Sequence, residues 1–203
     1  MSFRHEPSAD VHPEATVGDG SVIWHLAQVR EGARIGTGCV IGRGAYVGSG
    51  VELGDRVKVQ NYALVSEPAK VEDGVFIGPA VVLTNDRFPR AVTPDGDAKS
   101  AADWTPVGVT VREGASVGAR AVCVAPLTVG RWAMVAAGSV VTKDVPDYAI
   151  VAGNPARRRG WVGEAGVPLR AGGGSSWTCP TSGRTYSQVD EDTLVPDTHN
   201  EEA

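Results

Sequence analysis

The histidines of this 203-residue chain are its first candidates for acid–base chemistry, because imidazole titrates near neutral pH. There are four of them: His5, His12, His25 and His199. Three lie close to an end of the chain, and only His25 lies well inside the repeating pattern described below. Any chemistry that requires a strong histidine base therefore has one main candidate.

Arginine supplies most of the positive charge, with 15 arginines against 4 lysines. Arg87 and Arg90 lie in a polar segment that begins with Asn85 and Asp86, and a run of three arginines occupies positions 157–159. Guanidinium groups form bidentate contacts with phosphate and carboxylate groups. Both segments are candidate anion sites, and the alternative for each is a solvated, charged surface.

Composition and charge exclude several classes of protein. Hydrophobic residues make up 42% of the chain and charged residues 21%, which is typical of a folded globular protein. The net charge of −5 argues against general nucleic-acid binding. No apolar run approaches the roughly 18 residues of a membrane span, and three distant cysteines argue against a disulfide framework. We therefore expect a cytoplasmic protein without a nucleic-acid or membrane partner.

A six-residue repeat dominates the sequence. Stepping by six gives an aliphatic residue at thirteen consecutive positions: Val11, Val17, Ile23, Val29, Ile35, Ile41, Val47, Leu53, Val59, Val65, Val71, Ile77 and Leu83. The series resumes at Val111, Val117, Cys123, Val129, Val135 and Val141. A period of six fits neither a helix nor an alternating strand, but it fits a coil of short strands in which three sides close a rung of about 18 residues. The aliphatic residue points inward, and the glycine that often follows it allows a turn conformation.

The repeat predicts an all-β fold: a parallel β-helix of hexapeptide repeats over residues 1–156, with one extruded loop at 84–104. The loop interrupts the phase of the repeat and contains the turn signals Pro89, Pro94 and Asp95-Gly96. Residues 157–203 form a short C-terminal extension. From glycines 172–174 and the acidic end Glu201-Glu202 we expect it to contain a linker, a small adjunct and a disordered terminus.

Residues 18 apart in such a coil should stack on one another. The spacing predicts a first column of His25, Arg43, Asn61 and Pro79, and a second of Glu31, Ser49, Glu67 and Asn85. Beyond the loop, Ala119 should stack on Ala137, and Ala125 on Lys143.

Several motifs resemble those of the hexapeptide-repeat, or left-handed β-helix, acyltransferases, and within them the nucleotide-3-amino-sugar N-acetyltransferases. The similar stretches are Ile23-Trp24-His25, Lys58-Val59-Gln60-Asn61, Gly74-Val75-Phe76-Ile77-Gly78-Pro79, Thr84-Asn85-Asp86-Arg87-Phe88-Pro89-Arg90, Val140-Val141-Thr142-Lys143-Asp144-Val145-Pro146, Gly153-Asn154-Pro155-Ala156-Arg157 and Gly160-Trp161-Val162. The resemblance implies a left-handed coil, which is the reverse of the usual crossover hand. It also implies a homotrimer that binds acetyl-CoA between subunits and acetylates the amino group, at C3, of a UDP- or dTDP-linked amino sugar.

The chain departs from that family at two places. Gln28 stands where the family often carries a histidine, and a cysteine cluster common in relatives is reduced to Cys179, with Gly163 and Ser182 among the replacements. A tetrahedral zinc site needs four such ligands, so we predict no metal.

The resemblance assigns candidate roles to particular residues. Because an amino-sugar amine is partly neutral near pH 7, N-acetylation needs only a modest base, whereas O-acetylation needs a well-placed one. Related O-acetylating enzymes tend to place a histidine in the loop, and here that position is Asn85. Asn85 and His25 are therefore the catalytic candidates; the alternatives are an Asx turn for Asn85 and a hydrogen-bonded surface role for His25. Asn61, Asp86, Arg87 and Arg90 are the substrate-binding candidates, for the sugar and for its phosphates or a C6 carboxylate; the alternatives are a side-chain ladder for Asn61 and a solvated loop.

The cofactor candidates lie toward the C-terminal end of the coil. Ala119 and Ala137 would leave a slot for the pantetheine arm, with simple repeat filler as the alternative. Lys143, Asn154, Pro155 and Arg157 would lie near the CoA phosphates.

Three other functions compete with this interpretation. An O-acetyltransferase would act on a hydroxyl acceptor, and the missing loop histidine argues against it. A carbonic anhydrase on the same fold would need three histidine ligands for zinc, which one coil histidine does not supply. A non-catalytic hexapeptide scaffold would not bind CoA and would not need the 84–104 loop.

Overall fold

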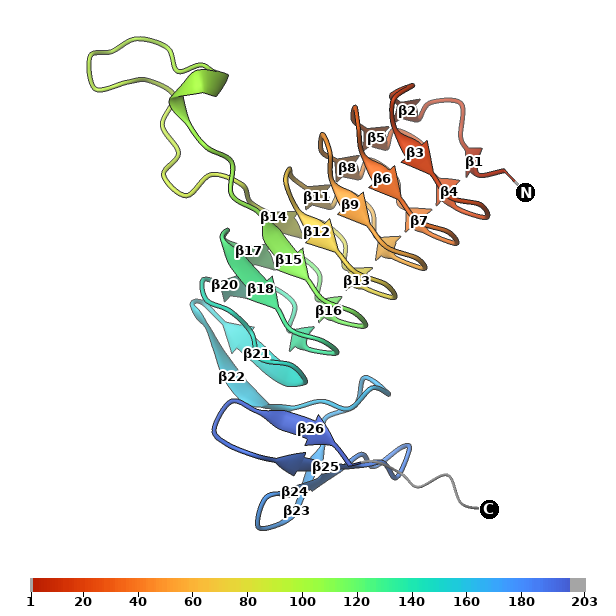
Figure 1. Ribbon diagram of the computed structural model, residues 1–203, viewed down its shortest axis with the longest axis vertical. Helices are drawn as coiled ribbons and strands as arrows, with labels where there is room; N and C mark the ends of the chain where they lie inside the picture. The colour runs from red at the N-terminus through yellow and green to blue at the C-terminus, as the bar shows by residue number, and fades with distance from the viewer. Residues whose placement is uncertain (1, 198–203) are drawn as a thin grey trace.

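The computed structural model describes residues 2–197 and shows a three-sided coil with a loop on one flank and a small sheet at one end (Figure 1). Sheet A contains β1 (Arg4–His5), β4 (Val22–Ile23), β7 (Val40–Ile41), β10 (Lys58–Val59), β13 (Phe76–Ile77), β16 (Ser116–Val117), β19 (Met134–Val135), β21 (Ala149–Gly153) and β22 (Ala156–Trp161). Sheet B contains β2 (Asp10–Val11), β5 (Gln28–Val29), β8 (Tyr46–Val47), β11 (Leu64–Val65), β14 (Val82–Leu83), β17 (Val122–Cys123) and β20 (Val140–Val141). Sheet C contains β3 (Thr16–Val17), β6 (Arg34–Ile35), β9 (Glu52–Leu53), β12 (Lys70–Val71), β15 (Val109–Val111) and β18 (Leu127–Val129).

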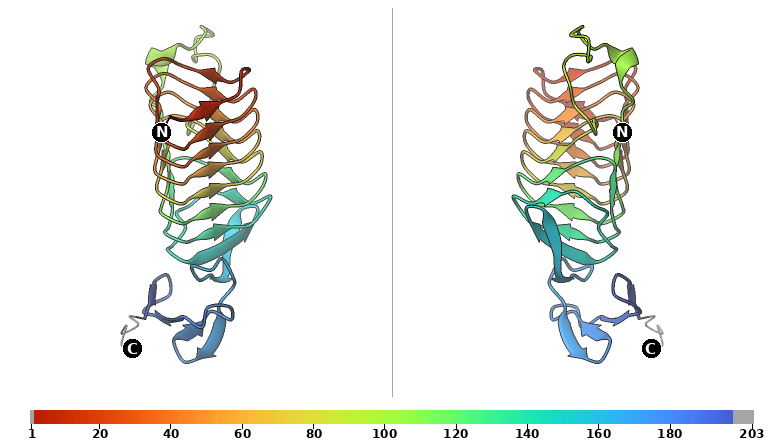
Figure 2. Two further views of the ribbon diagram at one scale, coloured as in Figure 1. Left: turned by 90° about the vertical axis from the view of Figure 1, so that its right-hand side faces the viewer. Right: turned by 90° about the vertical axis from the view of Figure 1, so that its left-hand side faces the viewer.

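The strands of each side stack in parallel, one rung above the next, which Figure 2 shows along the length of the coil. Val22 pairs with Val40 and Val40 with Lys58, so successive rungs keep the 18-residue register that the sequence predicts. The register resumes across the loop, where Val82 pairs with Val122. The prediction of a parallel β-helix of the left-handed type is confirmed.

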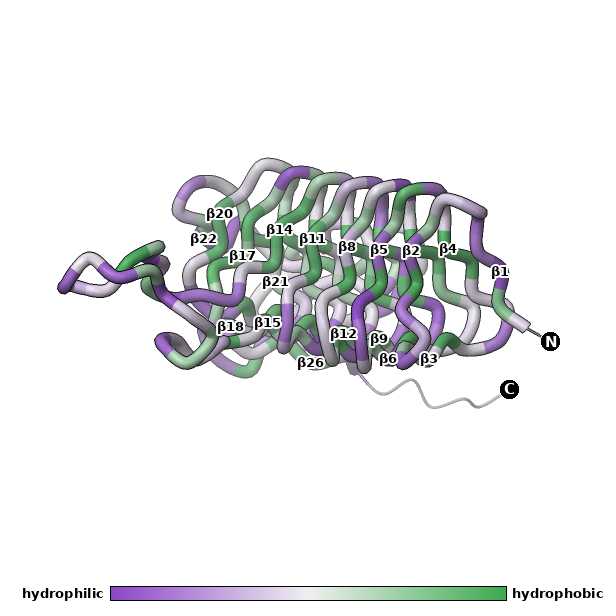
Figure 3. The backbone as a smooth tube through the Cα atoms, turned by 90° about the horizontal axis from the view of Figure 1, so that it is seen from above, coloured by the Kyte–Doolittle hydropathy of each residue, from purple (hydrophilic) through white to green (hydrophobic). Residues whose placement is uncertain are grey.

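The core is the column of inward residues that the repeat identified. Ile23, Val29 and Ile41 are at most 1% exposed, and the small residues between strands, such as Ala27 and Ala63, are fully buried. Figure 3 shows the hydrophobic segments recurring at the strands of successive rungs. Burial of one aliphatic side chain contributes about 1.5–3 kcal/mol, so the repeated column supplies most of the stability of the coil.

Glycines serve two different purposes, and only one was predicted. Gly36 follows an aliphatic residue but has an ordinary φ; a Cβ there would lie 2.5 Å from the Gly54 carbonyl oxygen, so its role is to let two rungs approach. Gly38, at the corner, has φ +64° and supplies the left-handed turn. At the equivalent corner positions Leu26 and Tyr62 adopt φ 59° and 60° without being glycine. The expectation that the post-aliphatic glycine makes the turn was therefore wrong.

The loop leaves the coil after β14 and returns at β15 (Figure 1). It folds back on itself, with a bridge between Val92 and Ala98, and contains the 3-10 helix η1 (Ala101–Asp103). Ser100 caps this helix: its side chain accepts the Ala102 N–H, and Asp103 accepts the Ser100 N–H at 2.7 Å. The loop is therefore a defined arm. No helix in the described residues is long and apolar enough to cross a membrane.

The C-terminal extension contains more regular structure than the sequence suggested. Strand β22 crosses the boundary expected at 156/157 and pairs antiparallel with β21. A separate antiparallel sheet follows, formed by β23 (Arg170–Gly173), β24 (Ser176–Thr178), β25 (Thr185–Gln188) and β26 (Leu194–Pro196). Glycines 172–174, expected to be a linker, lie at the hairpin between β23 and β24.

This sheet has its own core, which is why it is ordered. Tyr186 is fully buried and packs edge-on against Tyr148 of the last rung, at 5.5 Å between ring centroids. Trp161 and Trp177 both donate their indole N–H to Gln188 Oε1, at 3.3 and 3.1 Å. The acidic end that we expected to be disordered, residues 198–203, lies outside the described residues.

Candidate functional site

One corner of the coil collects residues that the sequence placed in two separate groups. At the A–B corner, defined as the turns between sheets A and B, His25, Arg43, Asn61 and Pro79 form a single column with Ala119 and Ala137. The Gly44 N–H donates to the His25 carbonyl at 3.0 Å, the Ala80 N–H to Asn61 at 2.9 Å and the Gly138 N–H to Ala119 at 2.8 Å. The corner therefore changes from long polar side chains to alanine along its length.

A second corner, between sheets B and C, contains the loop. At this B–C corner, Glu31, Ser49 and Glu67 precede Asn85, and Ala125 and Lys143 follow. Ser49 Oγ donates to Glu31 Oε1 at 2.7 Å, and the Ala125 N–H donates to Thr84 Oγ1 at 3.0 Å. Both predicted columns are therefore present, but on different edges of the prism.

The two catalytic candidates do not meet within one chain. His25 lies in the turn after β4, whereas Asn85 lies after β14, three rungs further along and on another corner. Each rung adds about 4.8 Å along the axis, so the side chains are separated by that rise as well as by the width of sheet B. A site that uses both residues requires more than one copy of the chain.

His25 is held by the first rung. Its Nδ1 lies 2.9 Å from Ser8 Oγ, and its Nε2 lies 3.5 Å from Glu6 Oε2. Both ring nitrogens therefore face neighbours of the same chain. This is the geometry of the hydrogen-bonded surface histidine that the sequence left open.

Asn61 is likewise engaged in the coil. Its Oδ1 accepts the Arg43 N–H at 2.9 Å, across the space above Gly42, where a Cβ would come within 2.7 Å of that oxygen. The side chain thus links two rungs, which favours the ladder alternative.

Asn85 differs from both. Its side chain is half-buried, and none of the described residues forms a hydrogen bond with its amide group. The Asx turn that was considered for it belongs to the next residue, because Asp86 Oδ1 accepts the Phe88 N–H at 2.8 Å. Asn85 therefore presents an unused amide at the base of the loop.

The loop forms a hollow of about 340 Å³ that contains two predicted residues. Asp86 and Arg90 line it together with Lys99, Ser100 and Trp104. Arg87 is not among the lining residues, and its guanidinium lies over the Phe88 ring at 5.2 Å. Lys99 was missed by the sequence analysis. The turn at Asp95-Gly96 was the signal for Lys99, since that turn brings Lys99 back to Ala91, whose carbonyl accepts its N–H at 3.0 Å.

A basic hollow of about 250 Å³ lies at the C-terminal end of the coil. Three cations line it, Lys143, Arg157 and Arg158, together with the carboxylates Asp144 and Asp192. Arg158 is already paired with the Glu191 carbonyl and with Asp192, and it lies over the Trp161 ring. Lys143 and Arg157 are exposed, and no ion pair joins either of them to another described residue. Asn154 and Pro155 form the adjoining turn between β21 and β22.

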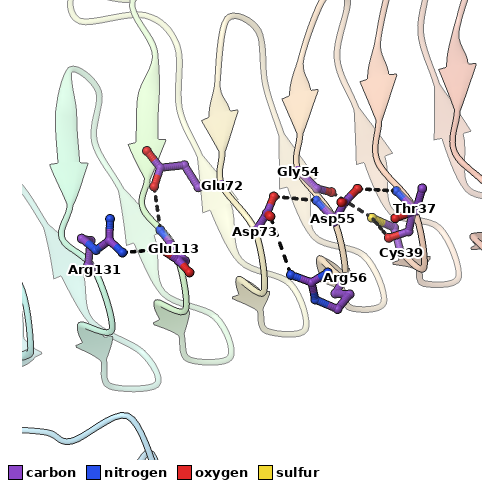
Figure 4. A network of polar contacts seen from close by, with 9 residues as sticks. All are labelled: Thr37, Cys39, Gly54, Asp55, Arg56, Glu72, Asp73, Glu113 and Arg131. Atoms are coloured by element: carbon purple, nitrogen blue, oxygen red, sulfur yellow. Dashed lines mark hydrogen bonds and ion pairs between the residues drawn. The ribbon is translucent and has the colours of Figure 1, made fainter. Parts of the chain in front are cut away.

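A hollow of about 660 Å³ on sheet C was not predicted. Arg34, Glu52 and Lys70 line its floor, and Arg34 pairs with Glu52. Figure 4 shows carboxylates of this region, among them Asp55 and Asp73, linking successive rungs. Asp55 accepts the Thr37 N–H at 2.7 Å, which lowers the pKa of Asp55, and Asp73 accepts the Asp55 N–H at 2.8 Å. These carboxylates therefore stabilise the coil by accepting backbone N–H groups of the preceding rung.

Neither the thiols nor the carboxylates form a metal site in residues 2–197, where no three histidine, cysteine, aspartate or glutamate side chains gather. Cys179 accepts the Ser182 N–H, and Leu169 and Tyr186 occupy the space beside Gly163. Burial raises the pKa of Cys123 to about 12, so this thiol is not a nucleophile. The absence of a metal stays a prediction.

Comparison with known proteins supports the repeat. Residues 14–49 match the bacterial transferase hexapeptide family (six repeats), and residues 108–143 match the hexapeptide repeat of succinyl-transferase. A segment of 52 residues, 26% of this chain and 27% of its relative, is 60% identical to the dTDP-3-amino-3,6-dideoxy-α-D-galactopyranose 3-N-acetyltransferase of Aneurinibacillus thermoaerophilus. The serine acetyltransferase of Haemophilus influenzae is 40% identical over 85 residues, 41% of this chain and 31% of that protein. The chain thus spans only about a quarter to a third of these relatives.

Solved structures share the fold. A mutant of the GDP-perosamine N-acetyltransferase of Caulobacter crescentus, in complex with CoA and GDP-perosamine, has a TM-score of 0.50 at 22% identity, covering 79% of this chain and 58% of that one. A hexapeptide-repeat-containing acetyltransferase of Vibrio cholerae, complexed with acetyl-CoA, has a TM-score of 0.51 at 22% identity, covering 65% and 72%.

Proposed function

We propose that the chain is a hexapeptide-repeat acyltransferase, since residues 14–49 and 108–143 match two hexapeptide-repeat models, and that it transfers acetyl from acetyl-CoA to a nucleotide-linked amino sugar. The acceptor is the amino group at C3 of a dTDP- or UDP-linked sugar. The segment that is 60% identical to an enzyme named for 3-N-acetylation of a dTDP-amino sugar supports this choice. The observation that carries it is the unused Asn85 amide at the base of the loop.

The reaction needs little from a protein base. The neutral amine attacks the thioester carbon, the C–S bond breaks, and the departing CoA thiolate takes up the proton that the nitrogen releases. Asn85 would accept a hydrogen bond from the amine and hold it in line with the thioester. Asp86, Arg87 and Arg90 would bind the sugar and its phosphates, and Lys99 would assist from the same hollow.

The donor would bind along the alanines of the A–B corner. The short side chains of Ala119 and Ala137 would leave room there for the pantetheine arm, and Ala137 is exposed. Lys143 and Arg157, in the basic hollow with the turn at Asn154 and Pro155, would bind the phosphates of CoA.

We place this site between copies of the chain, in a homotrimer. Asn85 and the alanine slot lie on different corners, so one chain supplies the loop and its neighbour the slot. The outward residues of sheet B are mainly apolar: Tyr46, Leu64, Val82, Val122 and Val140. Those of sheet C are polar: Thr16, Arg34, Glu52, Lys70, Thr110 and Thr128. Burial of sheet B and solvation of sheet C fit such an assembly.

A panel of dTDP- and UDP-linked 3-amino sugars, with acetyl-CoA and detection of the released thiol, tests the proposal. Thiol release that depends on the amino sugar, with an N-acetylated product by mass spectrometry, is expected. Release with hydroxyl acceptors but not with amines would contradict it.

The second candidate is O-acetylation of a small hydroxyl acceptor, favoured by the 40% identity to serine acetyltransferase over 85 residues. Asn85 in the loop argues against it, because an amide does not deprotonate a hydroxyl. L-Serine in the same thiol assay separates the two reactions.

A further inference from the structure

An acidic turn of the C-terminal extension lies beside the basic hollow at the end of the coil. The turn, residues 189–193, joins β25 to β26. The Asp192 N–H donates to Asp190 Oδ1 at 2.9 Å, and Gln188 donates its side-chain amide to the Asp190 carbonyl at 3.0 Å. Gln188 in turn accepts the indole N–H groups of two tryptophans. The turn is therefore a defined structure, and it brings three consecutive acidic residues close to the cations of the hollow.

Two carboxylates line the basic hollow, and only one of them is engaged by the coil. Asp144 Oδ1 accepts the Thr128 N–H at 2.7 Å, and Asp144 forms no ion pair with another described residue. Asp192 belongs to the turn of the extension, its side chain is 72% exposed, and its Oδ1 lies 3.7 Å from Arg158 Nη1. An exposed ion pair at this distance contributes little to stability. Asp192 is therefore a negative charge that a more strongly bound anion can replace.

Arg158 is the cation with which this turn pairs. Its Nη1 donates to the Glu191 carbonyl, and its guanidinium lies over the Trp161 ring at 4.6 Å from the centroid. Neither Nε nor Nη2 has a hydrogen-bond partner among the described residues. A guanidinium group carries five N–H donors in a planar fork. The carbonyl and the indole thus hold Arg158 in the hollow independently of Asp192, with donors left over for a phosphate.

We propose that Arg158 is a third ligand of the CoA 3′-phosphate and that Asp192 competes with this phosphate for it. This rests on the proposed function, which places the phosphates of CoA in the basic hollow beside Lys143 and Arg157. The entering phosphate pairs with the free N–H groups of Arg158 and takes the place of Asp192. The extension thereby lowers the affinity for CoA, but it leaves unchanged the affinity for a donor that lacks the 3′-phosphate.

Competition binding of CoA and dephospho-CoA to the full chain tests this inference. Asp192→Asn keeps the size of the side chain and removes its charge, and the fold should persist because Asp192 is exposed. The variant should bind CoA about 2- to 5-fold more tightly, the range expected when one exposed ion pair no longer has to be broken. Its affinity for dephospho-CoA should equal that of the native protein.

Asp190→Asn is the matched control, because it removes one charge from the same turn. Asp190 does not line the hollow, and an asparagine there can still accept the Asp192 N–H. This variant should bind both nucleotides as the native protein does, and the Tm of each variant verifies its fold.

A double variant separates competition for Arg158 from a general effect of charge on the hollow. Arg158→Gln alone should bind CoA about 10-fold more weakly, the size of one charge-assisted hydrogen bond. If Asp192 acts through Arg158, adding Asp192→Asn to Arg158→Gln should bring no gain in CoA affinity.

Two results would overturn the inference and leave the proposed function intact. One is a folded Asp192→Asn variant whose affinities for CoA and dephospho-CoA equal those of the native protein. The other is an equal gain from Asp192→Asn with and without Arg158. Failure of the native protein to bind either nucleotide would refute the inference and the proposed function together.

Discussion

The Val107 N–H donates a hydrogen bond of 2.9 Å to the Asn85 carbonyl oxygen, and this bond closes the base of the loop. A segment of more than twenty residues thus leaves and rejoins the coil at one point, without disturbing the pairing of Val82 with Val122. This bond fixes the backbone of Asn85 at the point where the arm leaves the coil. This is the arrangement expected of a side chain that must orient a substrate atom.

Asn85→Ala should lower kcat by about 100-fold, because the amine loses the group that aligns it with the thioester. The fold should persist, since the side chain forms no hydrogen bond to the described chain. Thiol release at saturating acetyl-CoA measures the effect. His25→Ala, which removes a residue held by Ser8 and Glu6, should leave kcat nearly unchanged. Equal, large losses in both variants would mean that His25 also contacts the substrate in the assembled protein.

Ala137→Trp should abolish tight CoA binding, because the indole would fill the slot on the A–B corner. Ala137 is exposed, so the substitution should not disturb the packing of the coil. Calorimetry with CoA measures the loss, and Thr16→Trp, at an exposed site on sheet C, is the control. Unchanged CoA affinity in Ala137→Trp would remove the A–B corner from the donor site.

Lys143→Ala and Arg157→Ala should each reduce discrimination between CoA and dephospho-CoA, which lacks the 3′-phosphate. The native protein should prefer CoA by about 10-fold, the size of one charge-assisted hydrogen bond. Competition binding with the two nucleotides measures the preference. If both variants discriminate as the native protein does, the basic hollow does not bind that phosphate.

Glu31 predicts an acid-sensitive component of stability. Hydrogen bonds from Ser49, from its own backbone and from Arg30 lower the pKa of Glu31 from 4.5 to about 2. A carboxylate with a depressed pKa in the folded state stabilises the fold above its unfolded pKa and loses that contribution as the pH falls toward the folded pKa. The Tm of the native protein should therefore fall more than that of Glu31→Gln between about pH 4.5 and 2. Parallel curves for the two proteins would contradict this.

Leu64→Asp should dissociate the proposed trimer, because it places a charge in the apolar face of sheet B. Leu64 is 41% exposed in the single chain. Light scattering during gel filtration measures the mass, and Lys70→Asp on sheet C is the control. An unchanged mass for Leu64→Asp would exclude sheet B as the contact surface.

The coil was predictable from the sequence because each hexapeptide must bury one aliphatic side chain in the same way. An inward aliphatic residue every six positions leaves a β-helix as the fold that buries them all, and Leu83 and Val111 marked where the phase broke. Which residues share a column was equally readable, since stacking follows from the 18-residue period. The sequence analysis did not place Ala119 in the same column as Pro79, because the loop changes the number of residues between these two positions.

The site was less predictable, because it depends on contacts that no period encodes. Nothing in the repeat distinguishes Glu31, which is paired, from Glu67, which is not; the difference lies in Ser49 and Arg30. The extension was underestimated for a related reason. Its core around Tyr186 is assembled from single residues of several short strands, and the glycines that suggested a linker serve a hairpin.

The antiparallel pairing of β22 with β21 has a consequence for the length of the molecule. Every other neighbour in sheet A is parallel, so a further copy stacked beyond a parallel end could continue the ladder indefinitely. Sheet A instead ends in the reversed strand β22. A further copy that met this end of sheet A would find an antiparallel edge and could not extend the parallel ladder in register.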